Sequence, residues 1–174
     1  GRGQLGPFGV VTHSFGGVVA RAALNLLQVR GELPLDGAGV RVVMLAPPNK
    51  GCSLARALRP DAANSMMAAA ALNYAFDYFL GNKAGLELAS GEEFPALPSC
   101  CEALVIAGSL GASHPLLSGI TDGVVTEEET GLQTPHARMT LTAPHHLLPR
   151  HPSAIRATLA FLAADPVPGA IFVP

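Results

Sequence analysis

The sequence contains few charged residues, and this makes one class of partner improbable. Only 14% of the 174 residues are charged, with 11 Lys and Arg against 13 Asp and Glu, and the formal net charge is -2 at pH 7. The basic residues are scattered along the chain, so they form no surface that would attract a phosphate backbone. We therefore expect no nucleic-acid partner.

Cysteine is scarce as well. The three cysteines, Cys52, Cys100 and Cys101, are odd in number and two of them are adjacent. This pattern does not fit the disulfide framework of a small secreted domain, so we interpret them as ordinary thiols.

Long apolar runs are also missing. The most apolar helical segment, Ser65 to Leu80, carries Asn73 and Asp77 and is shorter than the roughly 20 residues that a bilayer requires. We expect no transmembrane segment, and we interpret this stretch as a soluble helix or a lid.

Apolar residues are plentiful, at 49% of the chain, and they alternate between strand and helix patterns. Strands are expected at 8–12, 40–46, 103–107 and 138–142, and helices at 18–30 and 153–164. Continuous apolar strands separated by helices are typical of a mostly parallel sheet covered on both faces. The predicted fold class is therefore α/β, with one domain over residues 1–174 and a helical, lid-like insertion at about 53–99.

The stretch THSFGG places Ser14 where the first expected strand meets the first expected helix. At such a sharp turn a serine hydroxyl stands clear of the backbone, and small residues two positions away, here Thr12 and Gly16, relieve crowding. The unpaired N–H groups at the start of the helix make the Phe15 amide a candidate oxyanion donor, and Gly17 would let the helix approach the sheet. The competing interpretation is a glycine-softened turn with an incidental serine.

An acid and a base follow at the same expected end of the sheet. Asp122, in TDGVV, comes after the third expected strand, and His145 and His146 come after the fourth. Ligands of parallel sheets bind beyond the carboxyl ends of the strands. The chain order Ser, Asp, His, each past the end of a strand, is typical of one fold in particular.

The chain resembles the α/β-hydrolase superfamily, and more narrowly its lipase-like and PGAP-like serine hydrolases. THSFGGVVAR is similar to the nucleophile elbow, VVMLAPPNKGCSLA to the next strand with a Pro-Asn-x-Gly loop, TDGVVTEEET to the acid loop, and HHLLPRHPSAIRATLAFL to the segment that carries the catalytic histidine into the last helix. The resemblance implies Ser14 as nucleophile, Asp122 as acid, His145 as base and the Phe15 backbone as one oxyanion donor. It implies ester hydrolysis through an acyl-enzyme, with no metal or organic cofactor.

The histidines leave some alternatives open. In the resembled family the base stands about seven residues before the position that Pro152 matches, which favours His145 over His146. We interpret the remaining histidines as surface or packing residues: His13, His114, His136 and His151. A zinc site formed by His145, His146 and His151 is the weakest alternative, because the sequence has no CxxC or HExxH spacing.

The chain departs from the family pattern at three places. Thr12 replaces the first glycine of the elbow, and Cys52 stands where a serine is expected. Only 13 residues precede Ser14, whereas the family's nucleophile follows the fifth of eight strands. We therefore expect a C-terminal part of the fold that lacks the N-terminal strands and the second oxyanion donor. We also expect it to be poorly soluble, because its first strand would have an unpaired apolar edge.

Substrate choice is assigned to the insertion. Met66, Met67, Phe76 and Phe79 could line an acyl-chain pocket or belong to a lid, unless they simply pack on the core. The expected partner is a small ester or a lipid, and peripheral contact with a membrane is left open. The alternative functions are a catalytically silent α/β-hydrolase fragment that acts as a binding module, or a thioesterase or acyltransferase with the same triad.

Overall fold

The structure, a computed structural model, describes residues 5–34, 39–57, 94–111 and 114–174. Its elements in chain order are β1 (Phe8–His13), α1 (Gly16–Val29), β2 (Val40–Leu45), α2 (Ser53–Ala57), β3 (Cys101–Ser109), the 3-10 helix η1 (Glu128–Thr130), β4 (His136–Thr142), the 3-10 helix η2 (His145–Arg150), α5 (Pro152–Leu162) and β5 (Ile171–Val173).

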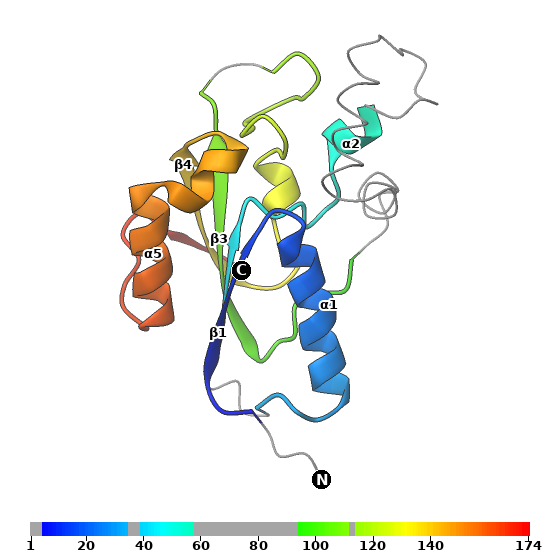
Figure 1. The fold of residues 1–174 in the computed structure, drawn as a ribbon, viewed down its shortest axis with the longest axis vertical. Helices are drawn as coiled ribbons and strands as arrows, with labels where there is room; N and C mark the ends of the chain where they lie inside the picture. Colours follow the sequence, from blue (N-terminus) through cyan, green and yellow to red (C-terminus); the bar gives the residue numbers. More distant parts are fainter. Residues whose placement is uncertain (1–4, 35–38, 58–93, 112–113) are drawn as a thin grey trace.

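These strands form one sheet in the order β1-β2-β3-β4-β5 (Figure 1). The first four are parallel, and β5 runs antiparallel to β4. Helix α1 covers one face and α5 the other (Figure 1). The prediction of a mostly parallel sheet flanked by helices is confirmed.

The central strands are buried on both faces of the sheet, and this explains why their sequences are continuously apolar. In β2, Val42 and Met44 belong to the core beneath α1, which includes Leu24. The alternate residues Val43 and Leu45 belong to the core beneath α5. Because successive side chains of a strand point to opposite faces, a strand covered on both sides must be apolar at every position.

Three elements of the structure were not predicted: β5 and the two 3-10 helices η1 and η2. Strand β5 has only three residues and pairs with β4 through His136 opposite Val173. It is too short and too exposed to give a period-two pattern. The segment after β4, for which no helix or strand was predicted, forms the 3-10 helix η2, which begins at His145.

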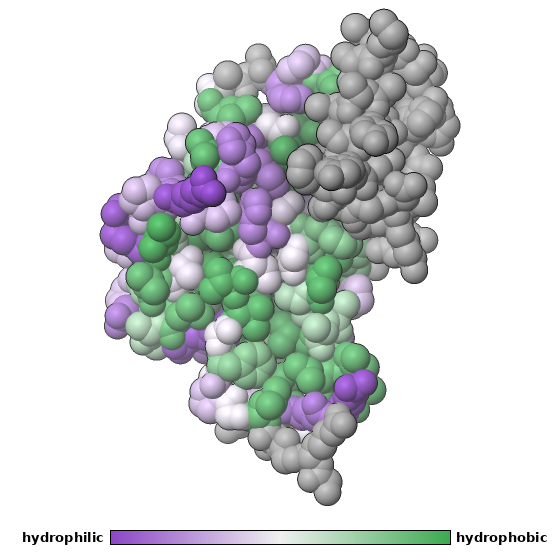
Figure 2. Space-filling view, viewed as in Figure 1, coloured by the Kyte–Doolittle hydropathy of each residue, from purple (hydrophilic) through white to green (hydrophobic). Residues whose placement is uncertain are grey.

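Strand β1 is an edge strand of the described sheet, since it pairs only with β2 there. Val11 is 49% exposed on it, and exposed apolar residues also lie on the two helices beside it: Val19 and Leu26 on α1, and Ile155 and Leu159 on α5. Figure 2 shows apolar surface across the middle of this side of the molecule, over β1 and between the two helices. An exposed apolar strand edge is a template for pairing with another chain.

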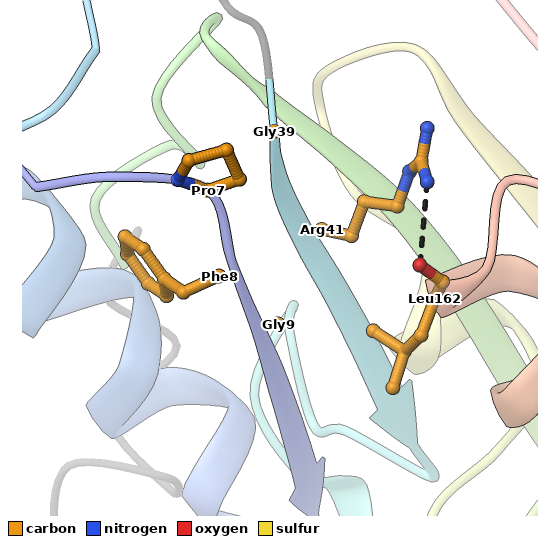
Figure 3. Close-up of a pocket in the computed structure, with 6 residues that line it drawn as sticks. All are labelled: Pro7, Phe8, Gly9, Gly39, Arg41 and Leu162. Carbon is orange, nitrogen blue, oxygen red and sulfur yellow. Dashed lines mark hydrogen bonds between the residues drawn. The ribbon is translucent and has the colours of Figure 1, made fainter.

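A pocket of about 430 Å³ lies at the amino-terminal ends of β1 and β2, against the last turn of α5 (Figure 3). Arg41 donates from Nη1 to the Leu162 carbonyl at 3.3 Å, so a cation meets the carboxyl end of α5, where the helix dipole favours one. A Cβ on Gly9 would lie 2.7 Å from Leu162 Cδ2, so the glycine permits this close approach. This pocket is at the opposite end of the strands from Ser14.

The described helices include none that is long and apolar enough to cross a membrane. Of the insertion expected at about 53–99, the structure describes α2 and residues 94–99. The helix expected from Ser65 to Leu80 lies outside the described residues. So do the four residues assigned to substrate contact: Met66, Met67, Phe76 and Phe79.

Candidate active site

Ser14 occupies a strained turn between β1 and α1. Its φ angle is 55°, in the left-handed region, which a residue with a side chain rarely adopts. The Ser14 amide donates to the Leu45 carbonyl at 2.8 Å, and its own carbonyl accepts from the Gly17 amide at 3.0 Å. The turn is therefore fixed to the carboxyl end of β2, and it holds the serine at this end of the sheet.

The two glycines after Ser14 differ in what they allow. A Cβ on Gly17 would lie 2.9 Å from Pro47 Cβ, so close packing of α1 on the loop after β2 requires this glycine. A Cβ on Gly16 would lie 3.7 Å from Thr12 Cβ, which is an ordinary contact. Gly16 is thus less constrained than the crowding argument suggested. Thr12, in place of the elbow's first glycine, donates its hydroxyl to the Val43 carbonyl at 3.4 Å.

Asp122 lies in the loop after β3 and is only 2% exposed. Its Oδ1 accepts hydrogen bonds from the Val124 amide at 2.9 Å and the Val125 amide at 2.8 Å. Its other oxygen, Oδ2, accepts from His145 Nδ1 at 2.7 Å. Backbone donors therefore fix the carboxylate, and one oxygen is left to orient the imidazole.

His145 connects the acid to the serine. With Nδ1 facing the carboxylate, its Nε2 lies 2.9 Å from Ser14 Oγ. A carboxylate can only accept, so Nδ1 carries the proton and Nε2 is free to accept the serine proton. The His145 amide also donates to the Asp122 carbonyl at 3.0 Å. Its neighbour His146 is exposed, and the described structure gives it no contact with Ser14 or Asp122.

The Phe15 amide is a free donor next to Ser14. Phe15 is the N-cap residue of α1. Within the part of the chain that the structure describes, no hydrogen bond uses this amide. The first amides of a helix have no partner within the helix, so they can stabilise an anion at its amino end.

A third residue contacts the histidine and was missed in the sequence. His13 Nε2 lies 3.1 Å from the His145 carbonyl oxygen, and the two ring centroids are 4.7 Å apart with an interplanar angle of 43°. Burial lowers the pKa of His13, and the nearby His145 lowers it further. His13 was expected to be a surface or packing residue, and its only signal in the sequence is that it adjoins Ser14.

Three buried side chains join the loops around the site: Arg21, Asn49 and Glu129. The Arg21 guanidinium donates to the Asn49 backbone and side chain, both at 3.1 Å, and Asn49 Nδ2 donates to the Thr130 carbonyl at 2.8 Å. Burial lowers the pKa of Arg21. Its guanidinium also donates to the backbone carbonyls of Pro95 and Phe94. The Glu129 carboxylate accepts from the amides of Ser53 and Thr126. These bonds connect α1, the loop after β2 and the loop that carries Asp122.

Cys52, which stands where a serine was expected, is buried and contacts the loop that carries Asp122. Its thiol donates to the Val124 carbonyl at 3.4 Å, next to the amide that binds Asp122. Burial raises the pKa of this thiol to about 11, so it stays protonated at neutral pH and is a poor nucleophile.

No group of three or more His, Cys, Asp or Glu side chains could hold a metal ion among the residues with a described position. The three histidines considered for zinc do not converge there. His145 uses both ring nitrogens for Asp122 and Ser14, and His151 Nδ1 accepts from the Ser153 amide.

Comparison with models of protein families gives no match, and neither does comparison with curated protein sequences. Among solved structures, the chain is similar to Bacillus licheniformis lipase BlEst2. The mature form of that lipase gives a TM-score of 0.51 at 19% identity, over 82% of this chain and 60% of that one. The propeptide form gives 0.52 at 19% identity, over 82% of this chain and 32% of that one.

The chain thus spans less than two thirds of the lipase chains that it matches. At this identity the likeness concerns the fold alone, and the narrower PGAP-like resemblance stays a prediction. Five mostly parallel strands flanked by helices, with lipase structures as neighbours, make this an α/β-hydrolase-like fold.

Proposed function

We propose that this chain carries the catalytic triad of a serine ester hydrolase. The observation that carries the proposal is the continuous hydrogen-bonded path from Ser14 Oγ through His145 to Asp122, with distances of 2.9 and 2.7 Å. A strained serine turn, a buried orienting carboxylate and an imidazole between them are the parts that acyl transfer requires.

In the proposed mechanism, Ser14 Oγ attacks the ester carbonyl carbon while His145 Nε2 takes its proton. The carbonyl oxygen becomes an oxyanion, to which the Phe15 amide donates. Asp122 stabilises the imidazolium and keeps it oriented. His145 then gives the proton to the departing alcohol oxygen, which leaves an acyl-enzyme on Ser14. Water attacks the acyl carbon, its proton passes through His145 back to Ser14, and the carboxylic acid is released. The cycle requires no cofactor.

The proposed substrate is a lipid or another hydrophobic ester. In support, the side chain of Phe15 packs on an apolar cluster of Cys52, Leu54, Ala55 and Leu117. An apolar wall beside the oxyanion donor suits an acyl chain better than a charged group. The similarity in fold to Bacillus licheniformis lipase BlEst2 agrees with this choice. Met66, Met67, Phe76 and Phe79 are proposed to line an acyl-chain pocket or to form a lid.

The first test is covalent labelling of the full chain with a fluorophosphonate, followed by intact-mass measurement. We expect one label per chain, lost in Ser14→Ala and retained in the matched variant Ser118→Ala, whose serine is exposed. If the unchanged chain takes no label, the catalytically silent binding module becomes the better description.

The acid is tested by Asp122→Asn, which keeps the shape of the side chain but removes its charge. By analogy with the Ser-His-Asp template, the labelling rate should fall by roughly 10⁴-fold. Asp165→Asn, at an exposed position after α5, is the matched control and should label at the normal rate. Ester and thioester substrates of increasing chain length, with water or an alcohol as acceptor, then separate esterase, thioesterase and acyltransferase activity.

A further inference from the structure

His13 and His145 are 132 residues apart in the chain, yet a hydrogen bond joins them at the site. His13 is the last residue of β1, and His145 is the first residue of η2. Since a carbonyl oxygen only accepts, the bond between His13 Nε2 and the His145 carbonyl requires a proton on Nε2. The contact therefore selects one tautomer of His13.

This bond completes the fixation of the His145 backbone. The amide of His145 donates to the Asp122 carbonyl at 3.0 Å, and its carbonyl accepts from His13 at 3.1 Å. Both peptide groups next to the His145 side chain are thus held, one from the acid loop and one from the serine turn. The Pro144 N-cap of η2 gives no side-chain hydrogen bond that could hold it instead.

Charge makes the neutral form of His13 necessary. The groups that act electrostatically on its ring are His145 on η2 and Asp122 on the loop after β3. In the proposed reaction His145 becomes a cation when it takes the Ser14 proton. A second cation with its ring centroid 4.7 Å away would oppose that step. A neutral His13 holds the carbonyl without this repulsion.

We propose that His13 is a positioning residue of the triad. In its neutral form, with the proton on Nε2, it holds the His145 carbonyl and so keeps the His145 ring between Ser14 and Asp122. This inference rests on the proposed function. It assigns His13 no contact with the substrate and no part in proton transfer.

Two variants distinguish the effect of the His13 hydrogen-bond donor from that of the shape of its ring. His13→Phe keeps a ring but removes the donor, and misplacement of a catalytic group should lower the fluorophosphonate labelling rate by roughly 10- to 10²-fold. His13→Gln keeps an N–H donor without a titratable ring, and its rate should stay within about threefold of the unchanged chain. Equal rates for His13→Phe and the unchanged chain would overturn the inference.

The pH profile supplies a readout that a merely structural role would not change. In the proposed reaction both His13 and His145 must be neutral. On the acidic side of a plot of log labelling rate against pH (the acid limb), the slope for the unchanged chain should therefore steepen to 2, which is second order in protons. His13→Gln removes the protonation of His13, so its acid limb should be lower by one order in protons than that of the unchanged chain. Circular dichroism at each pH shows where the protein is folded, and only labelling rates from that pH range enter the fit. A limb of the same order in both chains would contradict the inference.

A third measurement does not depend on any variant folding. In ¹⁵N-histidine NMR of the unchanged chain at about pH 8, His13 should be neutral with its proton on Nε2. A proton on Nδ1 would overturn the inference even if Ser14 is labelled normally. If the unchanged chain shows no labelling that depends on Ser14, the proposed function fails, and this inference fails with it.

Discussion

Gly108 leaves no room for a side chain beside Asp122. A Cβ on Gly108 would lie 2.7 Å from Asp122 Cβ and 2.7 Å from the Ala143 carbonyl oxygen. Gly108 is near the end of β3, and Ala143 directly follows β4. The absence of a side chain therefore allows the acid loop and the segment leading to His145 to meet over the end of β3.

Gly108→Ala should weaken the site and the fold together. The added methyl must displace backbone or Asp122, and such overpacking costs about 1 to 3 kcal/mol. We expect a lower unfolding free energy in urea and a labelling rate at least roughly tenfold lower, since the acid moves away from His145. Gly6→Ala is the control, because nothing lies within 4 Å of a Cβ there. Normal labelling of Gly108→Ala would show that the loop adjusts.

The choice between the two adjacent histidines can be decided by paired variants. His145→Ala removes the group between Ser14 and Asp122, and we expect labelling to fall by several orders of magnitude. His146→Ala changes an exposed side chain and should label normally. The reverse result would assign the base to His146.

Stability should decrease as the solution becomes acidic. Burial lowers the pKa of His13 and of His136 below the ordinary value of 6.5. Between 6.5 and the lower folded-state pKa the unfolded chain binds more protons, so the unfolding free energy falls as the pH is lowered through this window. Above 6.5 this contribution is fully present.

Thermal unfolding at a series of pH values tests this dependence. His13→Gln should make the fall in Tm below pH 6.5 shallower, and the double variant with His136→Gln should flatten it further. An unchanged slope in both variants would mean that other groups cause the dependence.

A charge on the exposed edge of β1 should reduce self-association. Val11→Lys places an ammonium group at a position that is 49% exposed on this edge strand, where lysine discourages strand pairing. We expect less light scattering and more monomer at equal concentration. Val29→Lys, at an 85% exposed position at the end of α1, adds the same charge away from the edge and should have a smaller effect. Equal effects of the two would point to net charge instead.

Local patterns were enough to predict most elements. The continuous apolar runs of β2 and β3 predicted buried parallel strands, because both faces of these strands lie in the core. The turn at Ser14 was predictable from the change in period between strand and helix. Strand β5 was not, because three exposed residues carry too little pattern.

The sequence by itself determined the class of the fold and the turn at Ser14. It also determined the chain order of Ser14, Asp122 and His145, each of which follows the end of a strand. These follow from burial periodicity and turn chemistry, which are properties of neighbouring residues. Only the tertiary structure put the ring of His145 against Ser14 and left His146 exposed, linked His13 to the His145 carbonyl, and required glycine at 108. Those contacts join residues far apart in the chain, and they depend on strand register and loop paths that no local pattern specifies.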